Sequence, residues 1–522
     1  MVASQILKKI LSSRLRRNLF SGYAASIWAT LIQIVSIPIY IRFMGIESYG
    51  LIGFYLILQS TLQILDLGLS PTINRELARH SASPESAADV RDLVRTLEFC
   101  CWSIGITIGV IITVCAPFIS FHWIKADNLS PDMVRRSIML MGFLLAIYWP
   151  LNFYQGGLMG LQKHVVCYTI QIVAVTLNNG GAILILWLVS PTITAFLTWN
   201  IIVNSLRTFI VLLSVWWNLP PSPRTSRIRL AVFVRLWRFV AGINVMSVLS
   251  LIVTQMDKII LSKLLNLSWF GYYTLAGSMA SGLTVIGGPV YNVVFPRFSA
   301  LIVQQDKKTL EQFFVRSFQL LAVLVIPVGI IISVFSHDIL WLWTRNVDVA
   351  KNVAPIASIM VIGTALNILT IPSYALQLAD GKTKHLSYIY GCSILILVPL
   401  IVFMAFLFGG IGTAICWVLF NTSYLVILLI ISAKWLPEIR MRWYLLNLVR
   451  PIMVSLGIVA AGRQFFVKDG SILYSLFFLI VITAIALTAT ALVTPSTRKW
   501  LEDIFRKPEY ACAKENRGKR AG

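Results

Sequence analysis

The chain has 522 residues, of which 57% are hydrophobic and only 12% are charged, and its mean hydropathy is +0.80. Soluble domains carry about 25% charged residues, so this composition excludes an ordinary soluble fold and indicates a polytopic membrane protein. The formal net charge of +23 would also suit a nucleic-acid-binding protein, so the distribution of that charge along the chain decides its meaning.

The N-terminal segment, "MVASQILKKILSSRLRRNLF", has a basic stretch that leads into an apolar run of full spanning length without a cleavage motif. We therefore expect a short amphipathic helix on the membrane surface rather than a cleavable signal peptide.

Fourteen apolar runs approach or exceed the length of about 20 residues that a helix needs to cross the hydrocarbon core. They predict an all-α polytopic membrane protein with about fourteen transmembrane helices. The thirteenth run is short and contains Arg463, so twelve helices are the alternative. The runs cover residues 20–41, 49–70, 98–120, 138–160, 166–189, 193–216, 240–262, 268–291, 317–336, 355–378, 387–408, 410–431, 451–467 and 471–493.

Lysine and arginine are distributed unequally between alternate loops. Of the 44 such residues, 33 fall on the side of the two termini and 9 on the other side, while Arg207 and Lys258 lie inside runs. This is the asymmetry of the positive-inside rule, so we expect both termini to face the cytoplasm. The rule accounts for the positive charge and makes nucleic-acid binding an unnecessary explanation.

The two halves of the chain resemble each other at an offset of 220 or 221 residues, which indicates the duplication of a six-helix unit. Because six is even, both repeats enter the membrane in the same direction, as in transporters that rock two lobes around a site at their interface. The matching pairs are Gly22 and Gly242, Arg42 and Lys263, Gly50 and Gly271, Arg95 and Arg316, Tyr154 and Tyr374, and His164 and His385.

This organisation predicts two pseudo-symmetric lobes and a C-terminal helix pair. The stretch "RTSRIRLAVFVRLWRF" between the lobes interleaves arginine with apolar residues at helical spacing, so we expect it to lie flat at the cytoplasmic interface. The predicted segments are a basic N-terminal segment (1–19), an N-lobe (20–217), an amphipathic linker (218–239), a C-lobe (240–432), the last two helices with the loop before them (433–494), and a basic cytoplasmic tail (495–522).

Polar residues form stripes on four of the runs, which predicts helices with one wet face. In run 240–262 the polar residues fall within an arc of about 160° on a helical wheel. Such stripes converge most simply on an aqueous cavity between the lobes. The stripes are Ser26, Thr30, Gln33, Ser36 and Tyr40; Gln59, Gln63 and Asp66; Asn200, Asn204 and Arg207; and Asn244, Ser247, Ser250, Thr254, Gln255, Asp257, Lys258 and Ser262.

Three charged residues within the runs need partners or water. Arg207 lies 14 residues from one end of its run and 9 from the other, too deep to reach bulk water easily. Left unpaired, Arg207, Asp257 and Lys258 would together cost roughly 7–10 kcal/mol. A structural ion pair or an interhelical clamp is one interpretation of each charge. The other, for Arg207, is a cavity where its planar donor fork would suit phosphate.

Motifs of common enzymes and ATPases are missing from the sequence. It has no P-loop GxxxxGK[ST], HExxH, GxSxG or CxxC, and its outer loops are too short to fold as a catalytic domain. The seven cysteines lie mostly inside apolar runs and are interpreted as small buried residues. We therefore expect no enzyme activity, no metal site, no cofactor and no disulfide.

Four stretches resemble the Wzx-type polysaccharide flippases of the MOP exporter superfamily, and the resemblance covers most of residues 15–435. They are similar, in order, to the first two helices and their loop, the end of helix 2, the stretch from helix 7 to helix 8, and the turn between helices 10 and 11. The stretches are "PIYIRFMGIESYGLIGFY" (38–55), "QILDLGLSPTINRELAR" (63–79), "QMDKIILSKLLNLSWFGYYTLA" (255–276) and "YALQLADGKTKHLSY" (374–388).

The resemblance implies a function. Such proteins move an undecaprenyl-diphosphate-linked oligosaccharide across the bacterial inner membrane for O-antigen, capsule or exopolysaccharide assembly, and a cationic cavity is thought to hold the diphosphate and sugar. Coupling to protons or sodium is implied as well. Expected partners are the lipid-linked substrate, membrane lipids and other membrane proteins of polysaccharide assembly. The last two runs depart from the twelve-helix core of many members and are similar to the extra helix pair of lipid II flippases.

These considerations give a hypothesis for the site. We expect alternating access by rocking of the lobes, with Asp257 and Asp66 serving in cation coupling or ion pairing. The expected diphosphate- and sugar-binding residues are Arg207, Lys258, Arg42, Asn200, Asn204, Gln33 and Asn244. The alternatives are a cation-coupled exporter of drugs or metabolites from the multidrug branch and, less favoured, a membrane enzyme of glycan assembly.

Overall fold

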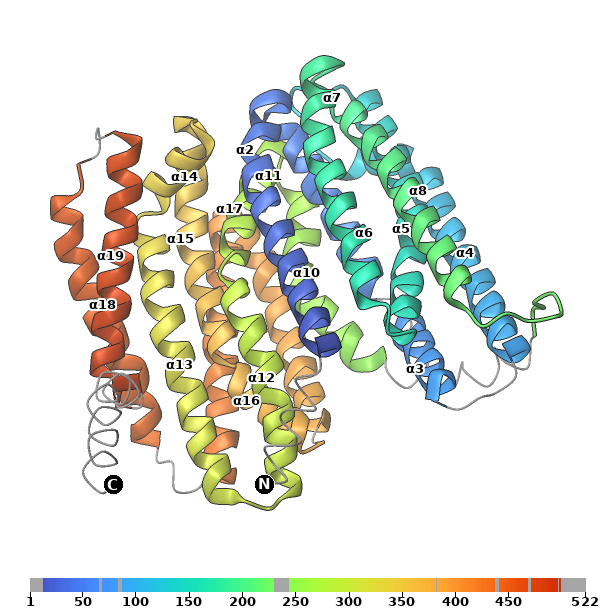
Figure 1. Cartoon of the computed structure of the whole chain (residues 1–522). Helices are drawn as coiled ribbons and strands as arrows, with labels where there is room; N and C mark the ends of the chain where they lie inside the picture. Colours follow the sequence, from blue (N-terminus) through green and yellow to red (C-terminus); the bar gives the residue numbers. More distant parts are fainter. Residues whose placement is uncertain are drawn as a thin grey trace, which may run out of the picture. The chain divides into compact units, whose positions relative to one another are not determined.

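The computed structural model describes residues 13–64, 68–82, 87–229, 244–381, 383–436, 441–467, 471–495 and 497–498. The regular structure in these residues is helical, and the only bridge between extended residues joins Lys125 to Asn266 (Figure 1). The prediction of an all-α fold is confirmed. Contacts within the chain separate it into two compact units, Met1–Tyr272 and Tyr273–Gly522.

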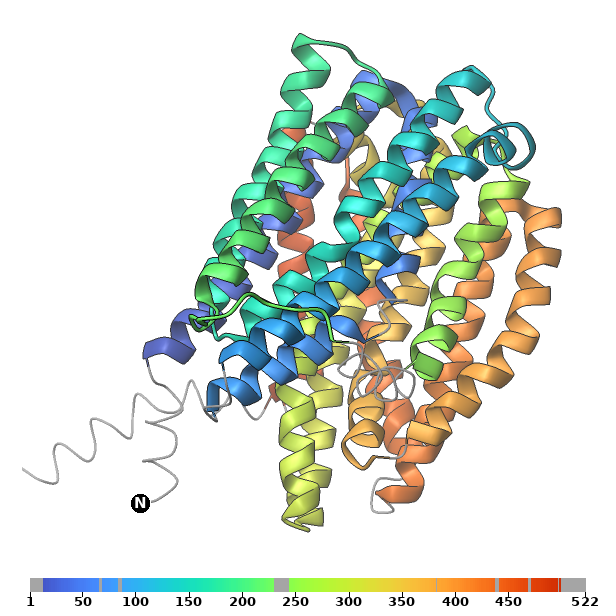
Figure 2. The same cartoon turned by 90° about the vertical axis from the view of Figure 1, so that its right-hand side faces the viewer.

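The first unit contains the helices that carry most of the predicted site. Helices α4, α5 and α8 run side by side, as two views at right angles show (Figures 1 and 2). The helices of this unit are α2 (Ser13–Ile64), α3 (Leu69–Ala82), α4 (Ala87–Phe118), η1 (Ile119–Trp123), α5 (Pro131–Gly160), α6 (His164–Thr176), η2 (Leu177–Gly181), α7 (Ala182–Leu188), α8 (Ile193–Asn218) and α10 (Asn244–Leu264), while α11 (Leu267–Ser281) crosses the boundary between the units.

The second unit contains the remaining helices, including the C-terminal pair α18 and α19, which pack against α13. Two long helices in the chain each join two predicted runs across a kink, α2 at Gly45 and α17 at Gly409. The helices of this unit are α12 (Thr284–Val303), α13 (Lys307–Val334), α14 (Ser336–Thr344), α15 (Val347–Leu369), α16 (Ile371–Ala379), α17 (Thr383–Trp435), α18 (Met441–Phe465) and α19 (Ile472–Val493).

The core of the first unit forms where apolar faces of α3, α4, α5 and α8 meet. Leu77, Leu97, Leu158 and Val215 are each at most 1% exposed and belong to one cluster of buried residues. Between α4 and α5 the backbones come so close that a Cβ atom on Gly142 would lie 2.9 Å from the carbonyl oxygen of Gly109. Small residues allow such close packing of helices in membranes, where packing rather than water exclusion drives association.

Within the described residues, eleven helical segments are long and apolar enough to span a membrane. Two of them, Ser21–Leu62 and Leu386–Trp435, each cover two predicted runs. Run 240–262 coincides with α10, which is not among the eleven, and run 268–291 is divided between α11 and α12. The chain is therefore a multi-pass membrane protein, and the number of fourteen spans stays a prediction.

The segment after α8 is hydrogen-bonded to α4 and does not form a helix. Residues 219–229 are not helical, so the expected surface helix does not include its first six residues, and residues 230–243 lie outside the described residues. Arg227 donates its backbone N–H to Asp92 over 2.7 Å, and Arg229 donates its own to the Thr96 hydroxyl over 3.0 Å. Backbone donors that bond to α4 are not available for a helix.

Candidate substrate-binding site

Arg207 lies near the middle of α8. It follows Ile193 by fourteen residues and precedes Asn218 by eleven. At 1.5 Å per residue, these separations put its Cα about 21 Å and about 17 Å from the two ends of the helix. The residue is therefore near the middle of a helix that is long enough to cross a hydrocarbon core about 30 Å thick.

The guanidinium of Arg207 has no ion-pair partner among the described residues. Its Nε atom is buried and makes no hydrogen bond there. None of the ion pairs found within the described residues involves it. The titratable side chains close enough to interact with it electrostatically are Tyr148 of α5, Cys167 of α6 and Tyr55 of α2. All three are ordinarily neutral at pH 7, so none of them compensates the positive charge.

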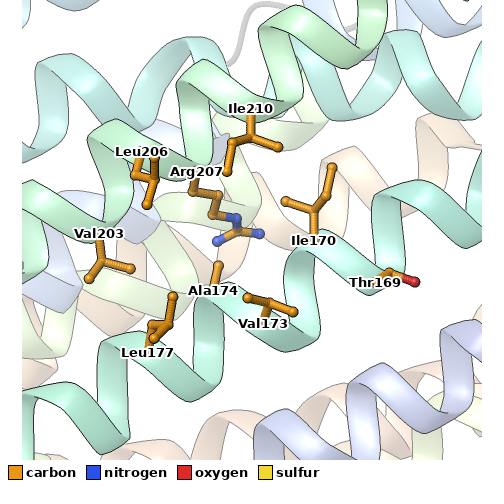
Figure 3. A pocket seen from close by; sticks show the side chains of 9 residues that line it. All are labelled: Thr169, Ile170, Val173, Ala174, Leu177, Val203, Leu206, Arg207 and Ile210. Atoms are coloured by element: carbon orange, nitrogen blue, oxygen red, sulfur yellow. The ribbon is translucent and has the colours of Figure 1, made fainter.

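A groove between α6 and α8 leads to this guanidinium. It encloses about 150 Å³, and Figure 3 shows Arg207 reaching from α8 toward α6 at its floor. The walls are apolar: Ile170, Val173 and Leu177 on one side, and Val203, Leu206 and Ile210 on the other. The groove thus combines a hydrocarbon-like wall with a single buried cation.

Asn200 and Asn204 share a helix face with Arg207 but use their amides mainly within α8. Asn200 donates to the Phe196 carbonyl over 2.9 Å, and Asn204 donates to the Asn200 carbonyl over 2.8 Å. Asn204 is 4% exposed, and its amide nitrogen lies 3.5 Å from the side-chain oxygen of Asn178. That separation is long for a hydrogen bond, so Asn204 links the helices only weakly.

Helix α2 connects to this region through the π-helix η2. The Tyr40 hydroxyl donates to the side-chain oxygen of Asn179 over 3.1 Å, and Trp28 donates to Thr176 over 2.8 Å. Gln33 and Arg42, also on α2, are exposed. Single π turns are frequent at functional sites because they reorient the side chains around them. This π turn was not predicted from the sequence.

The charged pair on α10 is half-buried. Lys258 donates to the side-chain oxygen of Gln255 over 3.2 Å, three residues earlier on the same helix. Asp257 is half-buried as well. Asn244 begins α10, but its side chain lies outside the described residues, as does Asp66. The convergence of these residues with Arg207 on one cavity stays a prediction.

A buried carboxylate that we did not predict joins three loops at one end of the first unit. Glu47 is 5% exposed and accepts backbone N–H groups from Asp127 over 2.7 Å and from Asn128 over 3.0 Å. Asn266 in turn donates to the Asp127 carboxylate over 2.7 Å. The orientation predicted from the positive-inside rule would put this end on the outer side of the membrane. In the sequence, the signal was a single acid between two long apolar runs.

A second unpredicted carboxylate lies at the opposite, basic end. Asp92 of α4 is completely buried, and it pairs with Arg224 over 2.5 Å and with Arg229 over 2.7 Å. These two arginines come from the segment that follows α8, more than 130 residues later. The acid therefore anchors the start of the linker to the first unit.

The second unit contains an arginine that is fully engaged. Arg463 near the end of α18 pairs with Asp338 of α14 and lies 5.0 Å from the ring of Phe335 and 5.6 Å from that of Phe466. Asp338 is 8% exposed. This ion pair explains how the short, thirteenth run accommodates a charge.

Comparisons with known proteins agree with this architecture. The sequence model of the family described as "Polysaccharide biosynthesis protein" matches residues 39–343. A Shigella flexneri protein whose name gives O-antigen transport as its proposed role is 24% identical over 425 residues, which are 80% of this chain and 96% of that protein.

Two solved transporter structures share the fold. The lipid II flippase MurJ in an inward closed conformation has a TM-score of 0.74 at 13% identity, covering 94% of this chain and 99% of MurJ. A MATE multidrug resistance transporter of the MOP superfamily has a TM-score of 0.63 at 13% identity, covering 78% of this chain and 95% of the transporter. These relatives are transporters rather than enzymes, as predicted. Since the family match spans more than half of its length, the chain belongs to the polysaccharide biosynthesis protein family and has the fold of MOP-superfamily transporters.

Proposed function

We propose that this protein flips an undecaprenyl-diphosphate-linked oligosaccharide from the cytoplasmic to the outer leaflet of a bacterial inner membrane, and that Arg207 binds the diphosphate. The family and its transporter relatives support polysaccharide transport. The finer proposal depends on one observation, a half-buried arginine whose buried Nε has no hydrogen-bond partner and which has no ion pair among the described residues.

The energetic argument starts from the cost of this charge. An arginine at the centre of a spanning helix costs about 2.5–3.5 kcal/mol on the insertion scale. Charges in such positions are paired within the protein or mark substrate pathways, and Arg207 has no ion pair among the described residues. A diphosphate offers oxygen pairs that match the guanidinium fork, and hydrogen bonds between two charged groups are roughly twice as strong as neutral ones.

The neighbours of Arg207 suit the same ligand. Tyr55 and Tyr148 lie near the guanidinium, and a phenol can donate a hydrogen bond to a phosphate oxygen. They contribute no negative charge that would compete with the anion. Arg42 and Lys258 are the further cations of this proposal, with Asn200, Asn204, Gln33 and Asn244 as polar contacts to the diphosphate or sugar.

In the proposed cycle, the lobes 20–217 and 240–432 rock against each other with both termini in the cytoplasm. Asp257 and Asp66 exchange a proton or a sodium ion, which supplies the driving force in the absence of an ATP-binding motif. Asp257 is half-buried in α10, an environment in which a carboxylate can respond to a cation.

The test is to deplete the protein from cells and to determine the mass and the leaflet of the lipid-linked glycan. Accumulation of intact undecaprenyl-diphosphate oligosaccharide facing the cytoplasm supports flipping. Unchanged amount and sidedness would contradict the proposal and favour export of drugs or metabolites. A glycan of altered mass that already faces outward would instead indicate an assembly enzyme.

A further inference from the structure

The groove between α6 and α8 opens on an exposed surface of the first unit. The side chains on its rim are apolar and exposed, with Val173 at 52%, Leu206 at 49%, Leu177 at 41% and Ile210 at 39%. An apolar exposed face on a membrane protein is in contact with lipid chains, because the bilayer interior is as apolar as these residues. The groove therefore joins the hydrocarbon of the membrane to the buried guanidinium.

We infer that this groove holds the first part of the substrate's polyprenyl chain while its diphosphate is bound to Arg207, so that the chain leaves the first unit sideways between α6 and α8. This inference rests on the proposed function and adds to it a binding site for the lipid. The sugar and the diphosphate are then separated from the lipid tail at the level of Arg207.

The size of the groove suits one repeating unit of such a chain. An apolar cavity of about 150 Å³ in a protein can bind benzene, so the groove has room for about one five-carbon isoprene unit. The isoprene unit attached directly to the diphosphate is the one that must lie within a few bonds of Arg207. The rest of the chain would extend past Val173 and Leu206 into the membrane.

The depth of Arg207 decides between this occupant and an ordinary phospholipid. The residue lies more than ten residues from either end of α8, so a hydrocarbon core centred on this helix would have Arg207 near its middle. The phosphate of a phospholipid stays in the interfacial region, about 15 Å from that centre. Only a lipid whose phosphate is being carried across the membrane reaches the floor of the groove with its headgroup.

Charge complementarity points the same way. The Nε atom of Arg207 is buried and has no hydrogen-bond partner in the described part of the chain, while the side chains that line the groove are apolar except for Thr169 and Arg207 itself. A neutral lipid tail alone would leave this donor unsatisfied. A prenyl diphosphate would place its apolar chain against the walls and its negative charge beside Arg207.

The experiment uses the purified full-length chain in lipid nanodiscs and measures equilibrium binding of geranylgeranyl diphosphate, pyrophosphate and geranylgeraniol. Val173→Trp and Leu206→Trp fill the groove from its two walls without touching Arg207. Val114→Trp is the matched control, because Val114 is an apolar residue of α4 that is 72% exposed away from the groove.

We expect Val173→Trp and Leu206→Trp to weaken geranylgeranyl diphosphate binding at least about tenfold, because the apolar area of an isoprene unit is no longer buried. Pyrophosphate binding should not change in these variants, and Val114→Trp should bind all three probes like the native chain. Unchanged geranylgeranyl diphosphate binding in both groove variants would overturn the inference.

Three further outcomes separate the groove from the proposed function. If phosphatidylglycerol displaces geranylgeranyl diphosphate from the native chain as well as unlabelled probe does, the occupant is a phospholipid and the inference fails. If the groove variants bind and export normally while Arg207→Gln does not export, the groove is refuted but the diphosphate role stands. If depletion leaves the lipid-linked glycan unchanged, the proposed function fails first and the inference fails with it.

Discussion

Arg207 and Arg463 both lie in apolar helices of this protein, and their surroundings differ. Arg463 of α18 is paired with Asp338 and packed over the rings of Phe335 and Phe466. Arg207 of α8 lies at the floor of an apolar groove, with no ion pair among the described residues. Arg463 is near the end of its helix, and Arg207 is near the middle of its own.

The difference separates a charge that braces the fold from one that is free to bind a ligand. Arg463 gains its compensation within the protein, so its removal would leave Asp338 buried without its partner. Arg207 has no such compensation in the described residues, so its removal takes away a cost rather than a contact. The two arginines should therefore respond in opposite ways to the same substitution.

The largest expected effect is the loss of export in Arg207→Gln. Removing one partner of a buried charged contact costs about 2 kcal/mol or more, which corresponds to a reduction in export of at least about 30-fold. Thermal stability should be unchanged or higher, because an uncompensated charge has been removed. Surface polysaccharide and protein abundance are measured in cells in which the variant replaces the native chain. Normal export at normal abundance would end the proposed diphosphate role.

A smaller effect is expected from Arg463→Gln and Asp338→Asn. Each should lower the free energy of unfolding by about 1–3 kcal/mol, less than for a fully buried pair because Arg463 is 35% exposed. The double variant should lose less than the sum of the two single losses. Thermal unfolding in detergent measures this, and export per folded molecule should be retained. A loss of export without a loss of stability would contradict the claim that Arg463 stabilises the fold while Arg207 binds the ligand.

Asp92→Asn tests whether pairing anchors the linker. The substitution keeps an oxygen for the backbone N–H of Arg227 but removes the charge that attracts Arg224 and Arg229. Because both arginines are about 40% exposed, we expect a loss of about 1–2 kcal/mol. Faster proteolysis within residues 219–229 is the readout, and an unchanged cleavage rate would show that the ion pairs do not hold this segment.

The smallest expected effect is that of Glu47→Gln. The amide retains one acceptor oxygen, so the N–H groups of Asp127 and Asn128 lose only the charge-assisted part of their bonds, about 1 kcal/mol. Hydrogen exchange at residues 127–129 should accelerate by about fivefold. The same experiment on Arg463→Gln is the control, since that residue lies in the other unit. Equal protection in both variants would mean that the carboxylate charge does not stabilise these loops.

The sequence predicted the helical fold and the exceptional position of Arg207 because both depend on local patterns. Apolar runs define spanning helices by length, and a charge in the middle of one is visible without a structure. The relation of Arg463 to Asp338 was not predictable in the same way, because the two residues are 125 positions apart and meet only through packing.

The groove was beyond prediction for a similar reason. It depends on the separation of α6 from α8, and its lining includes Leu177, the first residue of the π turn that follows α6. Periodicity also overstated the polar stripe of α2, where the hydroxyls of Ser26, Thr30 and Ser36 bond back to carbonyls of their own helix. A helical wheel shows which face is polar, but not whether its groups are already satisfied.

The most direct test of the central claim is the change in melting temperature that geranylgeranyl diphosphate produces in three proteins, the native chain, Arg207→Gln and Arg463→Gln. A ligand that binds the folded state raises its stability in proportion to its affinity. We expect a clear rise for the native chain and for Arg463→Gln, from its lower starting point, and little or none for Arg207→Gln. An equal rise in the native chain and in Arg207→Gln would contradict the assignment of Arg207 to the diphosphate.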